Sequence, residues 1–118
     1  MAFSVREHLQ KICEYFDSSK ANDRNLSLVY KIHDSGENDG VWTILINNCN
    51  CILETGEIPG YTAKMLMTAE AYERVVTGRM MLICAYWNGA IRYIGDTLAQ
   101  EELQSYLTIP QDSGIVAL

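Results

Sequence analysis

Three successive segments in the first half of the chain alternate apolar and polar residues, and this pattern constrains the fold more than any other feature. The predicted strands span 26–33, 41–46 and 49–55. Asn47-Asn48 suits a two-residue hairpin turn that pairs Ile46 with Cys49, and the preceding loop pairs His33 with Val41. One face of the sheet is then entirely apolar or aromatic: Leu28, Tyr30, Ile32, Trp42, Ile44, Ile46, Cys49, Cys51 and Leu53. Such a face must be covered by helices, whereas the opposite face predicts a solvated or thinly covered surface.

Helix signals flank this sheet on both sides in the sequence. Ser4 followed by Glu7 forms a capping box in front of an apolar stripe at helical spacing. Thr68 is expected to cap a second helix that stops at Gly78. The almost wholly apolar range 79–87 predicts a further short helix that is largely buried. Two more strands are expected at 61–67 and 90–94, and a last helix from Asp96 or Thr97 to Pro110.

The composition fits a single acidic domain. The chain has 118 residues, of which 48 % are hydrophobic, enough to form a core without disulfides or metals. A formal net charge of −6 without a basic cluster argues against nucleic acid as a partner. The longest apolar run, from Met80 to Trp87, is too short to span a membrane, which requires about 20 residues. We expect a cytoplasmic protein with one domain at 1–110 and a tail at 111–118.

No catalytic motif is recognisable in the chain. Glycine-rich phosphate loops, the GxSxG nucleophile motif and the HExxH zinc motif have no match in the sequence. Cys49, Cys51 and His33 are the strongest candidates for metal ligands, but the predicted register places His33 on the opposite face from both thiols. We therefore expect no metal, no cofactor and free buried thiols at the cysteines. A small isomerase-like enzyme using Asp96 or Glu102 is a less favoured alternative, because no partner that would orient either carboxylate is visible.

Methionines gather in the second half of the sequence. Met65 and Met67 point to the same side of one predicted strand, and Met80 and Met81 begin the apolar range. Methionine is flexible and polarizable, so it suits surfaces that accept variable apolar shapes. The pattern is typical either of ordinary core packing or of a pocket for an apolar ligand between the sheet and the later helices. Composition alone leaves both interpretations open.

The order of the elements and several local motifs resemble the sterol-carrier-protein-type lipid-binding domain. The likeness covers the hairpin DGVWTILI, the strand and capped helix YTAKMLMTAEAYERVVTG, and the segment WNGAIRYIGDTLAQEELQSYL. In the last segment the matching positions are Gly89, Ile91, Arg92, Ile94, Gly95, Asp96, Leu98, Ala99, Leu103 and Leu107. Ala90 departs from the family, which often has a basic residue there. Val116-Ala117-Leu118 lacks the basic middle residue of a peroxisomal address.

This resemblance implies an α+β fold in which a five-stranded, mostly antiparallel sheet carries helices on one face. It also implies non-catalytic binding of a fatty acyl chain, a sterol or a related lipid in an apolar tunnel between the sheet and the C-terminal helices. The expected partner is thus a hydrophobic small molecule. The expected ligand-binding residues are Met65, Met67, Tyr72, Val76, Met80, Met81, Cys84, Trp87, Leu103, Tyr106 and Leu107.

The alternative is a closed-core interaction or dimerisation module that binds no ligand. The last helix would then present Tyr106 and Leu107, with the apolar tail 115–118, to a partner protein or to a second copy in a homodimer. The two interpretations differ in what fills the space between the sheet and that helix.

Overall fold

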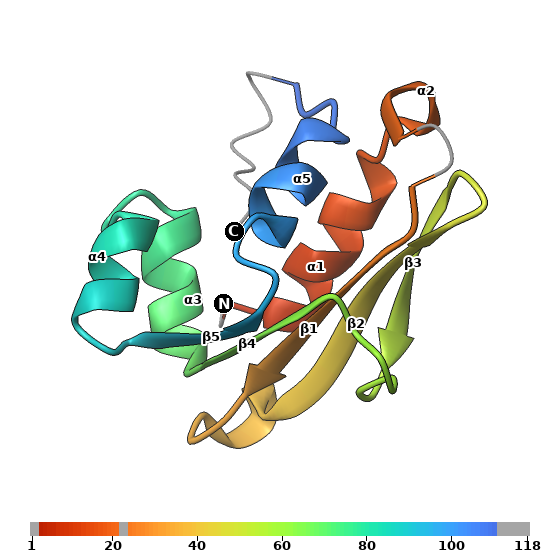
Figure 1. The fold of residues 1–118 in the computed structure, drawn as a ribbon. Coiled ribbons are helices and arrows are strands. Elements are labelled where there is room, and N and C mark those ends of the chain that lie inside the picture. Colours follow the sequence, from red (N-terminus) through yellow and green to blue (C-terminus); the bar gives the residue numbers. More distant parts are fainter. Residues whose placement is uncertain (1–2, 22–23, 111–118) are drawn as a thin grey trace.

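The computed structural model describes residues 3–21 and 24–110, which form one sheet with helices packed on one side (Figure 1). The helices are α1 (Val5–Glu14), α2 (Ser18–Ala21), α3 (Ala69–Val76), α4 (Leu82–Trp87) and α5 (Ala99–Ser105), with a 3₁₀ turn at Gly36–Asn38. The strands are β1 (Leu26–Ile32), β2 (Gly40–Asn47), β3 (Asn50–Thr55), β4 (Ala63–Met67) and β5 (Ile91–Gly95). Within these described ranges, no helix combines the length and the apolar character that crossing a membrane requires. The predicted tail at 111–118 lies outside the described residues.

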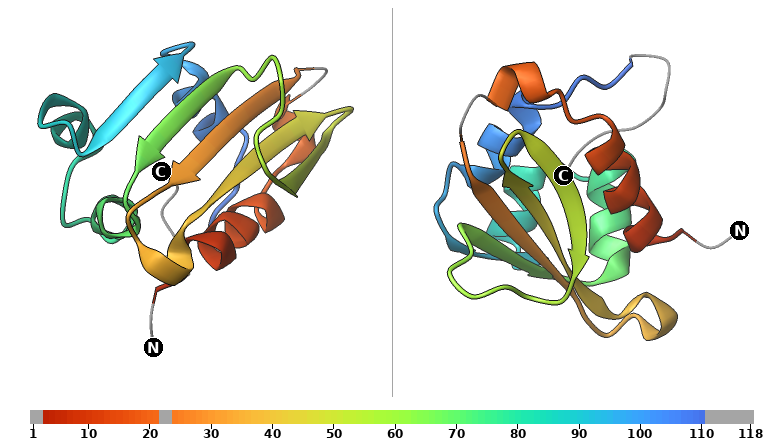
Figure 2. Two further views of the ribbon diagram at one scale, coloured as in Figure 1. Left: turned by 90° about the horizontal axis from the view of Figure 1, so that it is seen from below. Right: turned by 90° about the vertical axis from the view of Figure 1, so that its right-hand side faces the viewer.

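The five strands form a single sheet in the order β3-β2-β1-β4-β5. Each pair of neighbours is antiparallel except β1 and β4, which run parallel. The predicted α+β class and mostly antiparallel sheet are therefore confirmed. The parallel pair requires a crossover, and the segment 56–62 makes it by passing from β3 across the outer face of the sheet to β4 (Figure 2).

The hairpin turn lies one residue later than the sequence pattern placed it. Asn48 and Cys49 occupy the two turn positions, both in the left-handed region with φ of 52° and 62°. Ile46 consequently pairs with Cys51 and not with Cys49. The β1–β2 register differs from the prediction in the opposite direction, because Trp42 lies opposite Tyr30 and not opposite Ile32. Both predicted registers were wrong by a shift of two residues, which leaves the strand side chains on their predicted faces, whereas Cys49 lies in the turn and not on the apolar face.

The apolar face predicted for the first three strands forms one wall of the core. Leu28, Tyr30, Ile44 and Ile46 are each no more than 1 % exposed. Helix α1 packs against β2 and β3, and α5 packs against β1. The period-two pattern of the sequence thus determines which side of the sheet the helices cover.

The opposite face of the sheet is thinly covered, as predicted. The crossover segment lies on it, and the Thr43 hydroxyl donates to the Gly56 carbonyl oxygen at 2.7 Å. Val29 is fully buried on this side, whereas Lys31 and Glu54 are exposed. One loop is therefore the cover here, and no helix lies on this face in Figure 2.

Both predicted helix caps are present. The Ser4 hydroxyl accepts a hydrogen bond from the Glu7 backbone N–H at 3.2 Å, and the Thr68 hydroxyl accepts one from the Ala71 N–H at 3.1 Å. Glu7 lies in the first turn of α1, where the helix dipole favours an anion. Local sequence signals therefore determine where α1 and α3 begin.

The range 79–87 contradicts the prediction of a largely buried helix. Helix α4 begins only at Leu82 and buries a single residue, Ala85. Met81 is 70 % exposed and Trp87 is 80 % exposed. The main contacts of α4 are with β5 and α3, so only the side of this short helix that faces them is covered. An apolar residue on every side of a helix does not bury the helix when neighbours cover one side.

Candidate ligand-binding site

The space predicted to hold a ligand lies between the inner face of the sheet and α3, α4 and α5. Met65 and Met67 project into it from β4, and both are fully buried. Tyr72 and Val76 face them from α3, and Leu103 from α5, all within one hydrophobic cluster. We call this set of five side chains the inner apolar layer. These residues, predicted from the sequence, do come together, and they pack against one another.

The other predicted lining residues divide into three groups. Tyr106 and Leu107 belong to the buried cluster near the end of α5, and Met80 is half-buried against it. Met81, Cys84 and Trp87 face away from the cluster and are exposed. Exposure of Cys84 also corrects the expectation that every cysteine is buried. The burial of Tyr106 and Leu107 removes them as the docking surface that the interaction-module alternative assigned to them.

A hydrogen-bonded aromatic group closes one side of the inner apolar layer. The His8 Nδ1 atom of α1 lies 2.6 Å from the Tyr72 hydroxyl in a buried hydrogen bond. Tyr72 also meets the Tyr30 ring edge to face at 6.4 Å. Burial raises the pKa of Tyr72 well above its ordinary value, so the phenol remains protonated at neutral pH. This group is satisfied within the protein and offers little to a ligand.

Among the residues that the structure describes, two buried polar atoms have no hydrogen-bond partner: the Tyr86 hydroxyl and the Gln100 side-chain nitrogen. Gln100 is only 5 % exposed. Burial raises the pKa of Tyr86 to about 12, so its hydroxyl keeps its proton and can donate. An unsatisfied buried donor costs about 1–3 kcal/mol. Sequence reasoning missed both residues, because a glutamine in the first turn of a helix is typical of a solvated position.

Tyr93 connects these two donors. Its ring contacts the Tyr86 ring edge to face at 5.7 Å. Its hydroxyl donates to the Asp96 carbonyl oxygen at 2.6 Å and interacts with the Gln100 backbone N–H. Tyr86 and Gln100, the residues that carry the two unpartnered donors, are therefore both in contact with Tyr93. The Tyr86 hydroxyl and the Gln100 side-chain nitrogen can each donate a hydrogen bond to an oxygen atom of a bound molecule.

The C-terminal end of α5 is bonded to the part of the chain between α1 and β1. Arg24 binds Glu102 through two hydrogen bonds of 2.6 and 2.7 Å. The Asp17 backbone N–H donates to the Tyr106 carbonyl oxygen at 2.8 Å, and the Thr108 N–H donates to the Tyr15 carbonyl oxygen at 2.9 Å. Helix α5 is therefore held at its C-terminal end, whereas α4 has no comparable set of bonds among the described residues.

The two carboxylates weighed for catalysis have structural partners. The Arg24 guanidinium lowers the pKa of Glu102, which therefore remains ionised at neutral pH. Asp96 accepts the Leu98 N–H at 2.9 Å and so caps the turn that leads into α5. Glu102 also accepts a hydrogen bond from the Tyr106 hydroxyl at 2.5 Å, and both of its partners lower its pKa, so these contacts do not poise it to exchange a proton near neutral pH.

The thiol pair in the core differs from the one that the sequence suggested. Cys13 of α1 contacts Cys51 of β3, and this hydrogen bond together with burial raises the pKa of Cys13. His33 bonds instead to Asp34 at 3.0 Å. Across residues 3–21 and 24–110, no group of three His, Cys, Asp or Glu residues is arranged to hold a metal.

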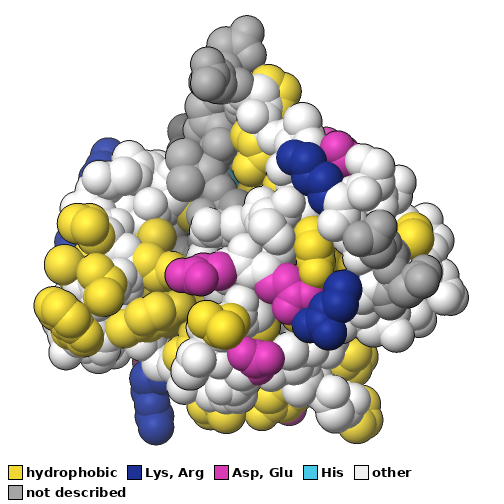
Figure 3. All heavy atoms as spheres, turned by 45° about the horizontal axis from the view of Figure 1, so that its top comes forward, with side chains coloured by type: hydrophobic (Ala, Val, Ile, Leu, Met, Phe, Trp, Pro, Cys, Tyr) yellow, Lys and Arg dark blue, Asp and Glu magenta, His cyan; other side chains and the backbone are white. Residues whose placement is uncertain are grey.

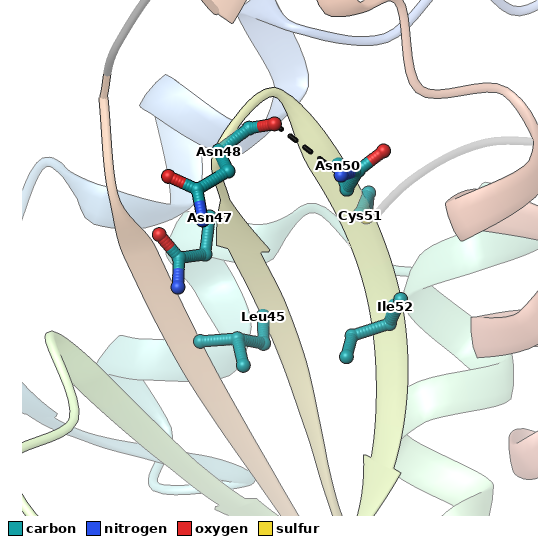
Figure 4. Close-up of a pocket in the computed structure, with 6 residues that line it drawn as sticks. All are labelled: Leu45, Asn47, Asn48, Asn50, Cys51 and Ile52. Atoms are coloured by element: carbon teal, nitrogen blue, oxygen red, sulfur yellow. Dashed lines mark hydrogen bonds between the residues drawn. The ribbon is translucent and has the colours of Figure 1, made fainter.

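An open hollow of about 330 Å³ lies at the turn end of the β2–β3 hairpin (Figure 4). It is lined by Leu45, Asn47, Asn48, Asn50, Cys51 and Ile52. The Asn50 side-chain amide donates to the Asn48 carbonyl oxygen at 3.3 Å across the turn. A second hollow of about 230 Å³ lies beside α3 and includes Met80 and Ala90. The first of these was not expected from the sequence, and it contains no charged side chain.

Comparison with known proteins agrees with this architecture. No protein-family model and no curated protein matches the chain. A structure of the sec-alkyl sulfatase PisA1, an enzyme from Pseudomonas sp., superposes with a TM-score of 0.81 at 15 % identity. That match covers 93 % of this chain but 17 % of the sulfatase, so the chain spans about a sixth of that enzyme.

Two sterol carrier proteins match over most of both chains. Sterol carrier protein 2 from Yarrowia lipolytica gives a TM-score of 0.61 at 11 % identity, covering 87 % of this chain and 89 % of its own. Sterol carrier protein 2 like 2 from Aedes aegypti gives 0.60 at 13 % identity, covering 86 % and 94 %. The chain is thus an α+β domain with a one-sided helical cover. More narrowly, its fold is that of the sterol carrier protein 2 domain, as the sequence resemblance predicted.

Proposed function

We propose that this protein binds and carries a hydrophobic ligand, such as a fatty acyl chain or a sterol, without catalysing a reaction. The ligand would lie in the inner apolar layer, between the sheet and α3 to α5. The observation that carries this proposal is the pair of unpartnered buried donors, Tyr86 and Gln100, at the edge of a layer that is otherwise apolar. The names of the full-length structural neighbours, sterol carrier proteins, support the same function.

The driving force for binding is burial of the apolar part of the ligand. Each Å² of apolar surface removed from water contributes roughly 25 cal/mol, so a long acyl chain gains several kcal/mol before ordering costs. Met65 and Met67 can change rotamer to follow different chain shapes, because methionine has an unbranched and flexible side chain. The layer therefore suits a class of apolar ligands and not one rigid shape.

The polar end of the ligand would bind at Tyr86 and Gln100. Both groups can donate a hydrogen bond to a carboxylate or hydroxyl oxygen, and neither has an acceptor within residues 3–21 and 24–110. A ligand oxygen at this position removes the desolvation penalty of the two donors. A ligand with one polar end should therefore bind more tightly than a purely apolar one. A plain hydrocarbon would gain only the apolar contribution.

Binding requires the inner apolar layer to open, since Met65, Met67 and Tyr72 are fully buried. Helix α4 is the element that we propose moves, because it buries only Ala85 and packs chiefly on β5 and α3. Helix α5 is held near its end by Arg24 and by backbone bonds to the segment after α1. The ligand would thus enter beneath α4. The thiol rather than disulfide state of Cys13 and Cys51 is in keeping with the cytoplasmic location that we propose.

Native mass spectrometry with palmitic acid and cholesterol tests this proposal. We expect a one-to-one complex with palmitic acid, and a Gln100→Met variant that binds it about tenfold more weakly because the donor is lost while length is kept. Gln10→Met, at an exposed position on α1, is the matched control and should bind like the unmodified protein. Absence of any complex with either lipid would refute the carrier function. Equal binding by Gln100→Met would refute the polar contact.

A further inference from the structure

Helix α4 carries a continuous exposed apolar surface that the proposed ligand site does not use. We call Met81, Ile83, Cys84 and Trp87 the α4 surface. Trp87 is 80 % exposed, Met81 70 % and Ile83 48 %. Figure 3 shows hydrophobic side chains gathered over the part of the molecule where α4 lies. Exposed apolar patches of this kind mark sites of interaction with another surface.

Helical geometry places three of these four side chains on one side of α4, and Met81 precedes them as the N-cap residue. Successive residues turn by about 100°, so Ile83, Cys84 and Trp87 fall within one sector of roughly 100°. Ala85, the buried residue of α4, lies on the other side of the helix and faces the protein. The helix therefore has two apolar sides, one packed on this fold and one directed outward.

The charge around the α4 surface differs from that of the rest of the chain. The sequence contains no Asp or Glu between Glu73 and Asp96, although the whole chain has a formal net charge of −6. Arg79 and Arg92 flank the helix in the sequence. On the neighbouring helix α3, Glu70 is paired with Arg74 at 2.6 Å. An apolar surface on a stretch of sequence whose only charged residues are arginines suits a partner that is apolar inside and anionic at its boundary.

We propose that the α4 surface docks on a phospholipid bilayer. Tryptophan is enriched at the boundary between headgroups and hydrocarbon, where Trp87 would insert with Met81 and Ile83. Arginine pairs well with phosphate oxygens, which every phospholipid headgroup supplies. The helix lies parallel to the bilayer in this pose and does not span it.

A second copy of the chain fits this surface less well. A symmetric dimer through α4 would bring the two sets of arginines toward each other, and the stretch contains no carboxylate to pair with them. The bilayer has no such conflict. The charge pattern therefore favours lipid over self-association.

Docking of α4 on a bilayer would also affect access to the proposed ligand site, and this consequence rests on the proposed function. The inward side chain of α4, Tyr86, contacts Tyr93 at one end of the site. A helix whose outer side is inserted in a bilayer can separate from β5 without exposing its apolar residues to water. The same element would then join the membrane to the cargo space.

Fluorescence with phosphatidylcholine vesicles tests the docking. The chain has two tryptophans, and Trp42 is buried while Trp87 is exposed. We expect vesicles to shift the emission to shorter wavelength, and lipids brominated along their acyl chains to quench it. Trp87→Phe should abolish both signals while the folded Trp42 spectrum remains. Emission that is unchanged by vesicles would overturn the proposal.

Vesicle flotation with paired variants supplies the second measurement. Met81→Ser combined with Trp87→Ser should lower the partition coefficient by about a hundredfold, roughly tenfold for each side chain withdrawn. Ile52→Ser, at another exposed apolar position on β3, is the control and should leave it unchanged. Circular dichroism melts of all variants should coincide, because the sites are exposed. Light scattering that showed a dimer dissociated by the double variant would instead assign the α4 surface to self-association and overturn the proposal.

Failure of docking and failure of the carrier function are separable. The double variant should still bind palmitic acid in native mass spectrometry, since neither residue belongs to the inner apolar layer. Palmitic acid binding without vesicle binding in the unmodified protein would refute docking alone. Vesicle binding without any lipid complex in solution would refute the carrier function alone.

Discussion

Helices α1 and α4 are both rich in apolar residues, but only one of them is covered. Helix α1 buries Val5, Leu9 and Ile12 against β2 and β3 and turns its charged residues to water. Helix α4 contains no charged residue and leaves most of its surface exposed. The apolar side of α1 is covered by the sheet and its charged side faces water, whereas the outer side of α4 is apolar and is exposed within the described fold. The difference supports the two proposals above, in which the α1 end of the molecule is a scaffold and the ligand and the bilayer bind at the α4 end.

The largest expected effect is a loss of stability at the α1 end. Ile44→Ala removes a side chain that is 1 % exposed beneath α1 and should lower the free energy of unfolding by about 2–5 kcal/mol. Ile83→Ala, on the outward side of α4, should change it by less than about 0.5 kcal/mol. Urea denaturation measures both. A similar loss for the two variants would show that α4 is as firmly integrated as α1.

Two glycine substitutions compare the end of strand β5, at Gly95, with the turn after helix α4, at Gly89. Gly95 has a φ of 108°, and a Cβ added there would lie 2.5 Å from the Thr62 carbonyl oxygen. Gly95→Ala should therefore cost about 1–3 kcal/mol through backbone strain and this clash. Gly89→Ala, at a φ of 82° with open space around it, should cost less because it has the strain without the clash. Thermal melts compare the two variants, and equal losses would show that the close approach to Thr62 is unimportant.

A smaller, pH-dependent effect is expected where α5 is fastened near α1. The contact with Arg24 lowers the pKa of Glu102 below its ordinary 4.5, so the folded state binds its proton less tightly than the unfolded chain. The resulting stability is complete above pH 4.5 and declines as the pH falls from there through the folded-state pKa. Glu102→Gln should lower the melting temperature modestly at neutral pH, since the pair is partly exposed. Melts between neutral and acid pH should converge for the two proteins, and a constant difference would exclude this ion pair as the cause.

The parts of the fold that follow from local chemistry were predictable from the sequence. The alternating pattern assigned the faces of the strand residues correctly, because a shift of two residues preserves them. The hairpin turn was predicted at Asn47-Asn48 but lies at Asn48-Cys49. The parallel pairing of β1 with β4 has no local signal and was not predicted, since the family resemblance implied only a mostly antiparallel sheet. Helix α4 was placed correctly but its burial was wrong, because an apolar sequence cannot show which side lacks a neighbour.

The candidate site was predictable to a similar degree. Met65, Met67 and Leu103 were assigned to the layer between sheet and helices because their periodicity gives their direction. Gln100 and Tyr86 were missed, since unpartnered buried atoms arise only when β5, α4 and α5 are brought together in three dimensions. Whether side chains or a ligand fill that layer depends on how readily α4 moves, which no sequence pattern describes.

Methionine methyl NMR tests the central claim most directly, because it observes the inner apolar layer and the α4 surface in one spectrum. With ¹³C-labelled methionine methyl groups, addition of palmitic acid in the absence of vesicles should shift the signals of Met65 and Met67, which are fully buried, and should affect exposed Met81 much less. Assignment comes from single Met→Leu variants. Unchanged Met65 and Met67 signals at saturating palmitic acid would contradict the account, because they would mean that no ligand enters the layer beneath α4.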